Sequence, residues 1–200
     1  EFVEVSLPDV KHGVSAYYTI APCEASSNLA RFDGNIYGHR AQGHPEDIDG
    51  FYTQNRSSSF GREVKRRILI GTYALSSGYY DDYYLKAQNI RHLIRHDFHV
   101  AFQSVDIILA PTTSSCAFKV GELVNDPVKM YQQDLFTIPV NLAELPSISF
   151  PIGFLDRMPI GIQAIGPKWS EKKLLNFVHK FQTMTDWHTL VPADFDHTPS

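Results

Sequence analysis

The sequence predicts an α/β domain, in which layers of β-strands are flanked by helices. Short apolar runs bounded by proline or glycine alternate along the chain with longer stretches whose apolar residues recur every three or four positions. The first pattern is typical of buried strands and the second of amphipathic helices. Neither an internal repeat nor a low-complexity linker interrupts the chain. Residues 1–200 are therefore predicted to form one domain.

The N-terminal part is predicted to contain a strand, a helix and a surface segment. Glu1–Leu7 alternates apolar and polar residues, as a half-buried strand does. Val14–Phe32 has a helical pattern, although Pro22 is expected to break or kink the helix. Gly34–Ser59 is rich in Gly, His, Asp, Asn and Ser, which indicates a surface excursion with one short helix at most.

Two long helices are predicted next, because both segments carry an apolar stripe at helical spacing. The stripe of Gly61–Ser76 consists of Val64, Ile68, Gly71 and Leu75. The stripe of Tyr79–Gln103 consists of Ala87, Ile90, Ile94, Phe98 and Ala101. The second segment therefore predicts a long amphipathic helix.

The C-terminal half is predicted to supply most of the sheet. Val105–Ala110 is a continuous apolar run before Pro111, which predicts a buried, central strand. Ile148–Ile152 and Ile160–Ile165 predict two more strands. The segment Thr112–Asn125 between the first two strands has the composition of a loop.

Capping residues predict two helices in this half. Asp126 precedes Pro127, which fits an N-cap followed by a proline in the first helical position. Ser170 is expected to cap a final helix whose inward face includes Leu174 and Val178.

Composition excludes several classes of protein. With 43% hydrophobic and 20% charged residues, the chain is globular in composition, and its net charge of -4 gives no general attraction to nucleic-acid phosphates. Two cysteines are too few for a disulfide framework and fit a reducing compartment, the cytoplasm or an organellar matrix. No apolar run approaches the ~20 residues of a membrane span. Because the sequence begins at Glu1 within a strand-like run, we expect it to be a piece of a longer protein.

Two charged positions are candidates for ligand binding. Lys65, Arg66 and Arg67 are consecutive, and consecutive helical residues point about 100° apart, so at least one of them is expected at the edge of the core. An arginine there could bind a carboxylate through its planar fork. Asp134 precedes an apolar run and is either an exposed residue or a buried anion that faces a cation. By residue type alone, solvated side chains remain the simpler interpretation of both.

Other candidates are weaker. His92, His96 and His99 recur at helical spacing and could present imidazoles to a metal, but no carboxylate framework accompanies them, so a solvated face and no metal are expected. Ser76 ends an apolar helix and is not expected to be a nucleophile. Cys116 lacks any cysteine-hydrolase signature, which favours a loop residue.

Three blocks of the sequence resemble, in order, the C-terminal part of the amidase signature family. They read YYTIAPCEASSNLAR, GREVKRRILIGTYALSSGYYDDYY and DPVKMYQQDLFTIPVNLAEL, and they begin at Tyr17, Gly61 and Asp126. Within that family they are most similar to the glutaminase subunits of aminoacyl-tRNA amidotransferases. The resemblance implies the C-terminal part of the amidase signature fold, with a layered mixed β-sheet flanked by helices.

The resemblance also implies roles for particular residues. Arg67 would bind the α-carboxylate of a glutamine donor, Asp134 its α-ammonium group, and Tyr17 would line the same pocket. Thr112 and Thr113 follow a buried strand where the family has a Pro-Thr near its cavity, so they are expected to line the cleft. Gln163, in one of the closing strands, is a possible polar exception within the scaffold.

The catalytic residues of the family are expected upstream of Glu1. Signature amidases use a lysine and two serines, and no Gly-rich serine loop occurs in these residues. The fragment alone is therefore expected to be inactive. The full-length subunit would hydrolyse glutamine within a heterotrimer with subunits B and C, and the B chain of that complex would contact Glu-tRNA(Gln) and use ATP and Mg²⁺. Two alternatives are a piece of a general amidase and a non-catalytic interaction module.

Overall fold

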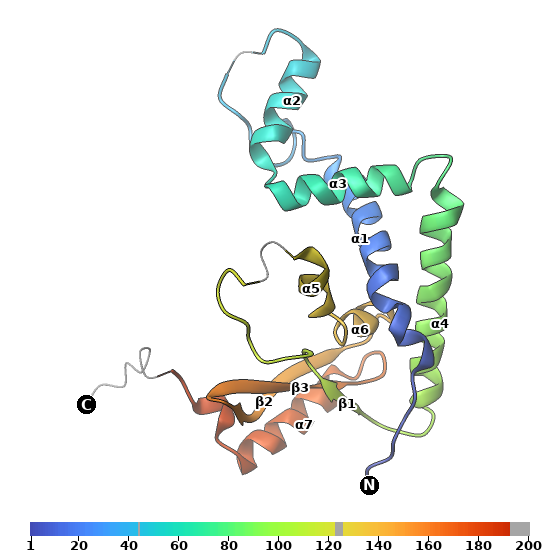
Figure 1. Ribbon diagram of the computed structural model, residues 1–200, viewed down its shortest axis with the longest axis vertical. Coiled ribbons are helices and arrows are strands. Elements are labelled where there is room, and N and C mark those ends of the chain that lie inside the picture. Colours follow the sequence, from blue (N-terminus) through green and yellow to red (C-terminus); the bar gives the residue numbers. More distant parts are fainter. Residues whose placement is uncertain (44, 123–125, 193–200) are drawn as a thin grey trace, which may run out of the picture. The chain divides into compact units, whose positions relative to one another are not determined.

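The computed structural model describes residues 1–43, 45–122 and 126–192. The chain divides into two compact units. The sheet unit comprises Glu1–Val14 and Arg91–Ser200, and the helical unit comprises Ser15–Ile90. Figure 1 shows the strands of the first unit and the helices of the second, and each unit is described by itself.

The helical unit contains the helices that the sequence predicts. Its elements are α1 (Gly13–Leu29), α2 (Ile48–Ser59), α3 (Arg62–Ala74), the π-helical turn η2 (Asp81–Leu85) and the start of α4 (Lys86–Ala101). The α1 helix continues through Pro22 without interruption, so the predicted break is wrong. Asp47 caps α2 by accepting a hydrogen bond from the Gly50 amide at 2.7 Å, which fixes the start of this helix.

Helices α1 and α3 approach each other closely at a glycine. Gly71 of α3 is buried, and a Cβ atom at this position would lie 2.0 Å from the Pro22 carbonyl oxygen. Nearby, the hydroxyl groups of Ser26 and Thr72 are hydrogen-bonded at 2.9 Å. The absence of a side chain at Gly71 therefore permits contact between the two helix backbones.

The sheet unit is built on an antiparallel sheet. In the described residues the sheet consists of β1 (Ile108–Pro111), β2 (Ser147–Leu155) and β3 (Met158–Ile165), in the order β1-β3-β2. The three predicted strands are confirmed, but β1 lies at an edge of this sheet, so its predicted central position is wrong. Only β3 pairs on both sides within the described residues. The apolar run of β1 reflects burial of its face, not two neighbouring strands.

Helix α7 (Glu171–Met184) covers one face of the sheet, as Figure 1 shows. The core between them contains Phe150, Ala164, Leu174 and Val178. Ser170 is the N-cap residue of α7, but its hydroxyl donates to the Pro167 carbonyl at 2.6 Å instead of accepting from the helix.

Several short elements complete this unit. They are η1 (Pro8–His12), α5 (Pro127–Gln132), α6 (Ile138–Leu142) and η3 (Trp187–Thr189). Asp126 caps α5 by accepting from the Lys129 amide at 3.1 Å, as predicted. The loop predicted at 112–125 is irregular wherever it is described, while 123–125 lie outside the described residues.

The predicted strand at Glu1–Leu7 is wrong, because this segment is irregular. Phe2 is 95% exposed and Val3 is 56% exposed, so the alternating pattern here corresponds to no buried face. An alternating segment becomes a strand only where it finds a partner to pair with and a core to cover. In the described part of the chain, no helix combines the length and apolar character needed to cross a membrane.

Candidate functional site

A buried glutamine organises the region around the end of β1. Gln163 of β3 is 2% exposed, and its amide nitrogen donates to the carbonyl oxygens of Pro111 at 3.1 Å and Phe136 at 2.8 Å. The Ser147 hydroxyl donates to its amide oxygen at 3.1 Å. Alternation along β3 places Gln163 on the face opposite Ala164 and α7. One side chain thus joins the end of β1, the start of β2 and the segment before α6.

The first candidate threonine is fixed to the sheet. The Thr112 hydroxyl is hydrogen-bonded to the Ser149 hydroxyl of β2 at 2.8 Å. A Cβ atom at Gly161 would lie 3.2 Å from the Thr112 hydroxyl oxygen, so β3 passes directly below this pair. Thr113 donates to the Ser115 carbonyl at 2.8 Å and holds the turn that follows.

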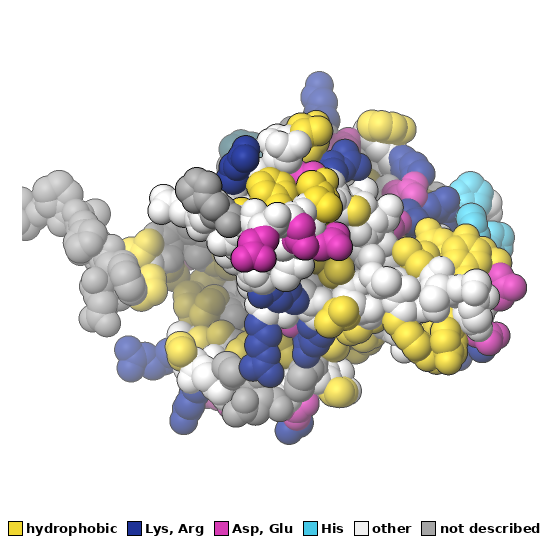
Figure 2. Space-filling view, turned by 90° about the horizontal axis from the view of Figure 1, so that it is seen from above, with side chains coloured by type: hydrophobic (Ala, Val, Ile, Leu, Met, Phe, Trp, Pro, Cys, Tyr) yellow, Lys and Arg dark blue, Asp and Glu magenta, His cyan; other side chains and the backbone are white. Residues whose placement is uncertain are grey.

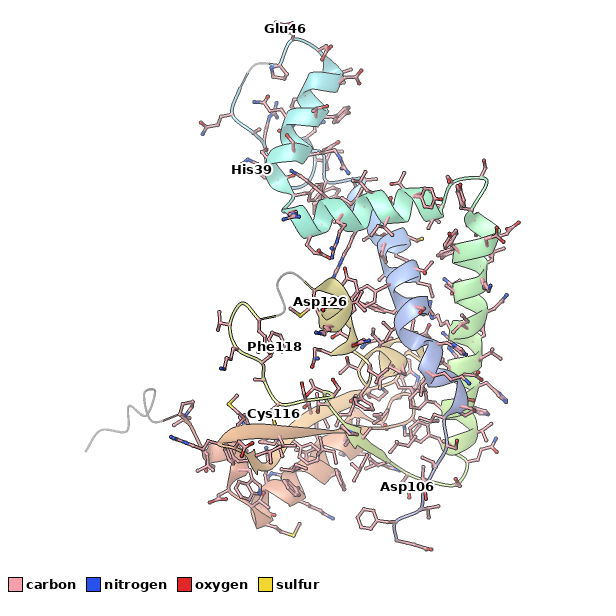
Figure 3. All side chains as sticks on the ribbon, viewed as in Figure 1. His39, Glu46, Asp106, Cys116, Phe118 and Asp126 are labelled. Atoms are coloured by element: carbon pink, nitrogen blue, oxygen red, sulfur yellow. The ribbon has the colours of Figure 1, made fainter. Side chains whose placement is uncertain are left out.

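The threonine loop contacts the segment that carries Asp134. The hydroxyls of Ser114 and Ser115 donate to the side-chain oxygen of Gln133 at 3.4 and 3.2 Å. Asp134 is half-buried, and its carbonyl accepts from the amides of Thr137 and Ile138. The sheet unit therefore brings the threonine loop and the segment of Asp134 together, as the sequence predicts. Figure 3 shows Cys116 and Phe118 further along this loop and Asp126 at the start of α5.

The other two candidates lie in the helical unit. Arg67 is half-buried and donates through Nε to Glu63 at 3.1 Å, one turn earlier on α3. Arg66 pairs with the other oxygen of Glu63 at 2.7 Å. Arg67 lies four residues before Gly71 and therefore on the side of α3 that faces α1. Tyr17 of α1 is half-buried and packs edge-to-face on Tyr18, with ring centroids 5.3 Å apart.

The predicted orientation of the basic triplet agrees with this geometry. Lys65 is exposed and reaches back to the Ser57 carbonyl at 2.6 Å, whereas Arg66 and Arg67 are half-buried. Tyr17 and Arg67 thus belong to the helical unit, and Asp134, Thr112 and Thr113 to the sheet unit. A common pocket for all five remains a prediction.

The weaker candidates occupy structural positions. Ser76 follows α3 and donates to the Tyr73 carbonyl at 2.7 Å, which fits a helix end. Burial raises the pKa of the Cys23 thiol, which disfavours a reactive thiolate. The three histidines of α4 are exposed, and no group of three or more His, Cys, Asp and Glu side chains in the described residues is arranged to hold a metal ion.

Sequence reasoning missed an ionic cluster around Glu144. This residue has a left-handed backbone with φ of 60°, and its carboxylate pairs with Arg91 at 2.6 Å, Lys168 at 3.0 Å and Arg95. The hydrogen bond from Lys168, together with the charges of the two arginines, lowers the pKa of Glu144 below its ordinary value. No local pattern announces the cluster, since its members come from α4 and two loops that are distant in sequence.

The cluster predicts a pH-dependent contribution to stability. Because the folded-state pKa of Glu144 is lowered, the contribution is complete above the unfolded value of about 4.3 and is lost as the pH falls through the folded value. Glu144→Gln should reduce the free energy of unfolding by about 1 kcal/mol at pH 7, because the pairs are partly exposed. Urea unfolding of both proteins at pH 7 and below pH 4 measures this difference. A difference that persists undiminished in acid would contradict the carboxylate's role.

A family comparison matches most of the chain. The family model described as Amidase matches residues 1–175. The A-type chain of the glutamyl-tRNA(Gln) amidotransferase from Alkalilimnicola ehrlichii is 54% identical over 196 residues, which cover 98% of this chain and 40% of that protein. The corresponding chain from Methylococcus capsulatus is 56% identical over 190 residues, 95% of this chain and 39% of that protein. The chain thus spans about 40% of the length of these relatives.

Solved structures share the fold. The A-type chain of the glutamyl-tRNA(Gln) amidotransferase from Thermotoga maritima matches with a TM-score of 0.59 and 40% identity, over 85% of this chain and 32% of that chain. A structure described as an amidase matches with a TM-score of 0.65 over 90% of this chain and 37% of that chain. At 20% identity, the second match shows the fold alone.

Proposed function

The chain belongs to the amidase family, and from this membership we propose that it is the C-terminal, substrate-recognition part of the glutaminase subunit of an aminoacyl-tRNA amidotransferase. The observation that carries the proposal is 54% identity to the A-type chain of a glutamyl-tRNA(Gln) amidotransferase over 98% of the present chain. The complete protein would hydrolyse glutamine to glutamate and ammonia. The ammonia would then convert Glu-tRNA(Gln) to Gln-tRNA(Gln) on a second chain of the complex.

The proposed ligand is a zwitterionic amino acid. Arg67 would bind its carboxylate, Asp134 its ammonium group, and Tyr17 would pack against its carbon chain. The ion pair between Arg67 and Glu63 supports this role, because a partner one turn away holds the guanidinium before any ligand arrives. Thr112 and Thr113 would line the cleft from the sheet unit, where the bond between Thr112 and Ser149 fixes their loop.

The proposed partners follow from the names of the relatives. The printed names describe subunits, which supports assembly into a complex of several chains. We place subunits B and C in that complex, with ATP, Mg²⁺ and Glu-tRNA(Gln) bound mainly by the B chain, and the complex in the cytoplasm. The family lysine and both serines would come from residues upstream of Glu1.

A general amidase is the alternative with the same fold, and a non-catalytic interaction module is the other. The pair Arg67 and Asp134 distinguishes the first, because an apolar amide offers no charge to either residue. A full-length protein that hydrolyses simple aliphatic amides but not glutamine would support the general amidase.

The 200-residue chain alone is expected to release no ammonia from glutamine, because no Gly-rich serine loop is present in its sequence. A coupled glutamate dehydrogenase assay on purified protein measures the release, and circular dichroism verifies that the protein is folded. The full-length protein serves as the positive control. Glutamine hydrolysis by the pure 200-residue chain would refute the upstream position of the nucleophile.

A further inference from the structure

A cavity of about 570 Å³ lies in the sheet unit beside α4. It is enclosed by the C-terminal half of α4, the segment from Ala143 to Leu145 and the β3–α7 loop at Pro167. Phe98 is 2% exposed, and its ring stacks on Phe102 with centroids 6.4 Å apart. The volume falls within the range of about 300–1,000 Å³ that is typical of sites for small molecules.

The rim of this cavity is cationic. Arg95, Lys168 and the three histidines of α4 line it, and Glu144 pairs with both Arg95 and Lys168. Among the described residues, that one carboxylate is shared by Arg91, Arg95 and Lys168, so positive charge remains in excess. The carboxylate of Asp97 does not offset it, because it accepts the Asp9 amide at 2.7 Å. Figure 2 shows histidine side chains beside cationic and hydrophobic ones on the face that it draws.

One donor in this rim is unused. The terminal nitrogen of Arg95 binds Glu144, whereas its Nε is buried and has no hydrogen-bond partner among the residues that the structure describes. A buried guanidinium N–H without an acceptor is unfavourable, and a carboxylate is the acceptor that fits its planar geometry. The unused donor and the excess positive charge both favour an anion, and the two phenylalanine rings favour an apolar body.

We propose that this cavity binds a small molecule that combines an aromatic or aliphatic body with a carboxylate. The carboxylate would interact with Arg95 and Lys168, and the body would pack against Phe98, Phe102 and Leu145. Tyr17, Arg67 and Asp134 do not line the cavity, so this site is separate from the proposed glutamine pocket. The proposal therefore does not depend on the proposed function.

The charge requirement is tested with two ligands of the same ring. Isothermal titration of the full chain at pH 7.5 compares 2-naphthoate with the neutral 2-naphthalenemethanol. We expect the acid to bind about tenfold more tightly, the ratio that one charge-assisted hydrogen bond can supply. Arg95→Met should abolish the preference, whereas Arg62→Met, which removes an exposed arginine of α3, should preserve it. Equal binding of acid and alcohol, or an unchanged preference in Arg95→Met, would overturn the proposal.

The location is tested by filling the cavity. His99 is an exposed lining residue, so His99→Trp adds volume at the rim without disturbing the core. This variant should keep the melting temperature of the parent and lose at least tenfold in affinity for both ligands. Binding of 2-naphthoate at parental affinity to a folded His99→Trp protein would place the ligand elsewhere and refute the assignment. An absence of any 2-naphthoate binding to the parent would also refute it.

Discussion

Arg67→Ala in the full-length protein is expected to lower kcat/KM for glutamine by roughly 30-fold or more. Removal of one partner of a charged contact costs about 2–5 kcal/mol, and about 1.4 kcal/mol corresponds to tenfold. We expect the lower end of this range, because Arg67 is only half-buried and keeps Glu63 as a partner. Asp134→Ala should have a similar effect, because the ammonium group of the donor would lose its counter-charge. Steady-state ammonia release at varied glutamine concentration measures both effects.

Lys65→Met provides a matched control for this experiment. Lys65 lies on the same helix, carries the same charge and is exposed with its ammonium group on the Ser57 carbonyl. Its replacement should leave kcat/KM within about twofold of the parent, because surface substitutions away from a site have small effects. Unchanged glutamine kinetics in both Arg67→Ala and Asp134→Ala would remove these residues from the pocket and, with them, the main argument for an amino acid donor.

Gly71→Ala is expected to destabilise the protein by about 3 kcal/mol, near the upper end of the usual cost of overpacking. The new Cβ would lie 2.0 Å from the Pro22 carbonyl oxygen and 2.4 Å from its carbonyl carbon. Both atoms belong to the backbone of a helix, so the conflict cannot be relieved by rotation of a side chain. Urea-induced unfolding of the parent and the variant measures the loss.

Gly78→Ala is the control for this substitution. Gly78 lies in the turn after α3, and a Cβ atom there would meet nothing within 4 Å. Its replacement should therefore change the free energy of unfolding by less than about 0.5 kcal/mol. If Gly71→Ala unfolds at the same urea concentration as Gly78→Ala, the close approach of α1 and α3 is not present in solution.

Periodic segments of the sequence predicted their structure well, and segments that depend on distant partners did not. The stripe of Gly61–Ser76 becomes α3, because one apolar face is enough to define a helix against any core. Glu1–Leu7 has the pattern of a strand, but pairing cannot be read from one segment. The edge position of β1 was missed for the same reason. Helix α6 is five residues long and has too few turns for a period to appear.

The candidate site divides in the same way. The loop that carries Thr112 and the segment of Asp134 were expected to be near each other, and hydrogen bonds to Gln133 join them. The anchoring role of Gln163 was only suspected, since a polar residue in an apolar strand gives no indication of its partners. Glu144 gave no signal at all, because its three cations come from separate elements.

The amide of Gln163 has a consequence for how this family can change its substrate. Its two donated bonds end on main-chain carbonyls of Pro111 and Phe136, and main-chain atoms are present whatever side chains the neighbouring positions acquire. Substitutions in the threonine loop or around Asp134 can therefore alter the surface offered to a donor while the distance between the two segments stays the same. Gln163 separates the evolution of specificity from the upkeep of the scaffold, and variation in amide preference should accumulate around it and not at it.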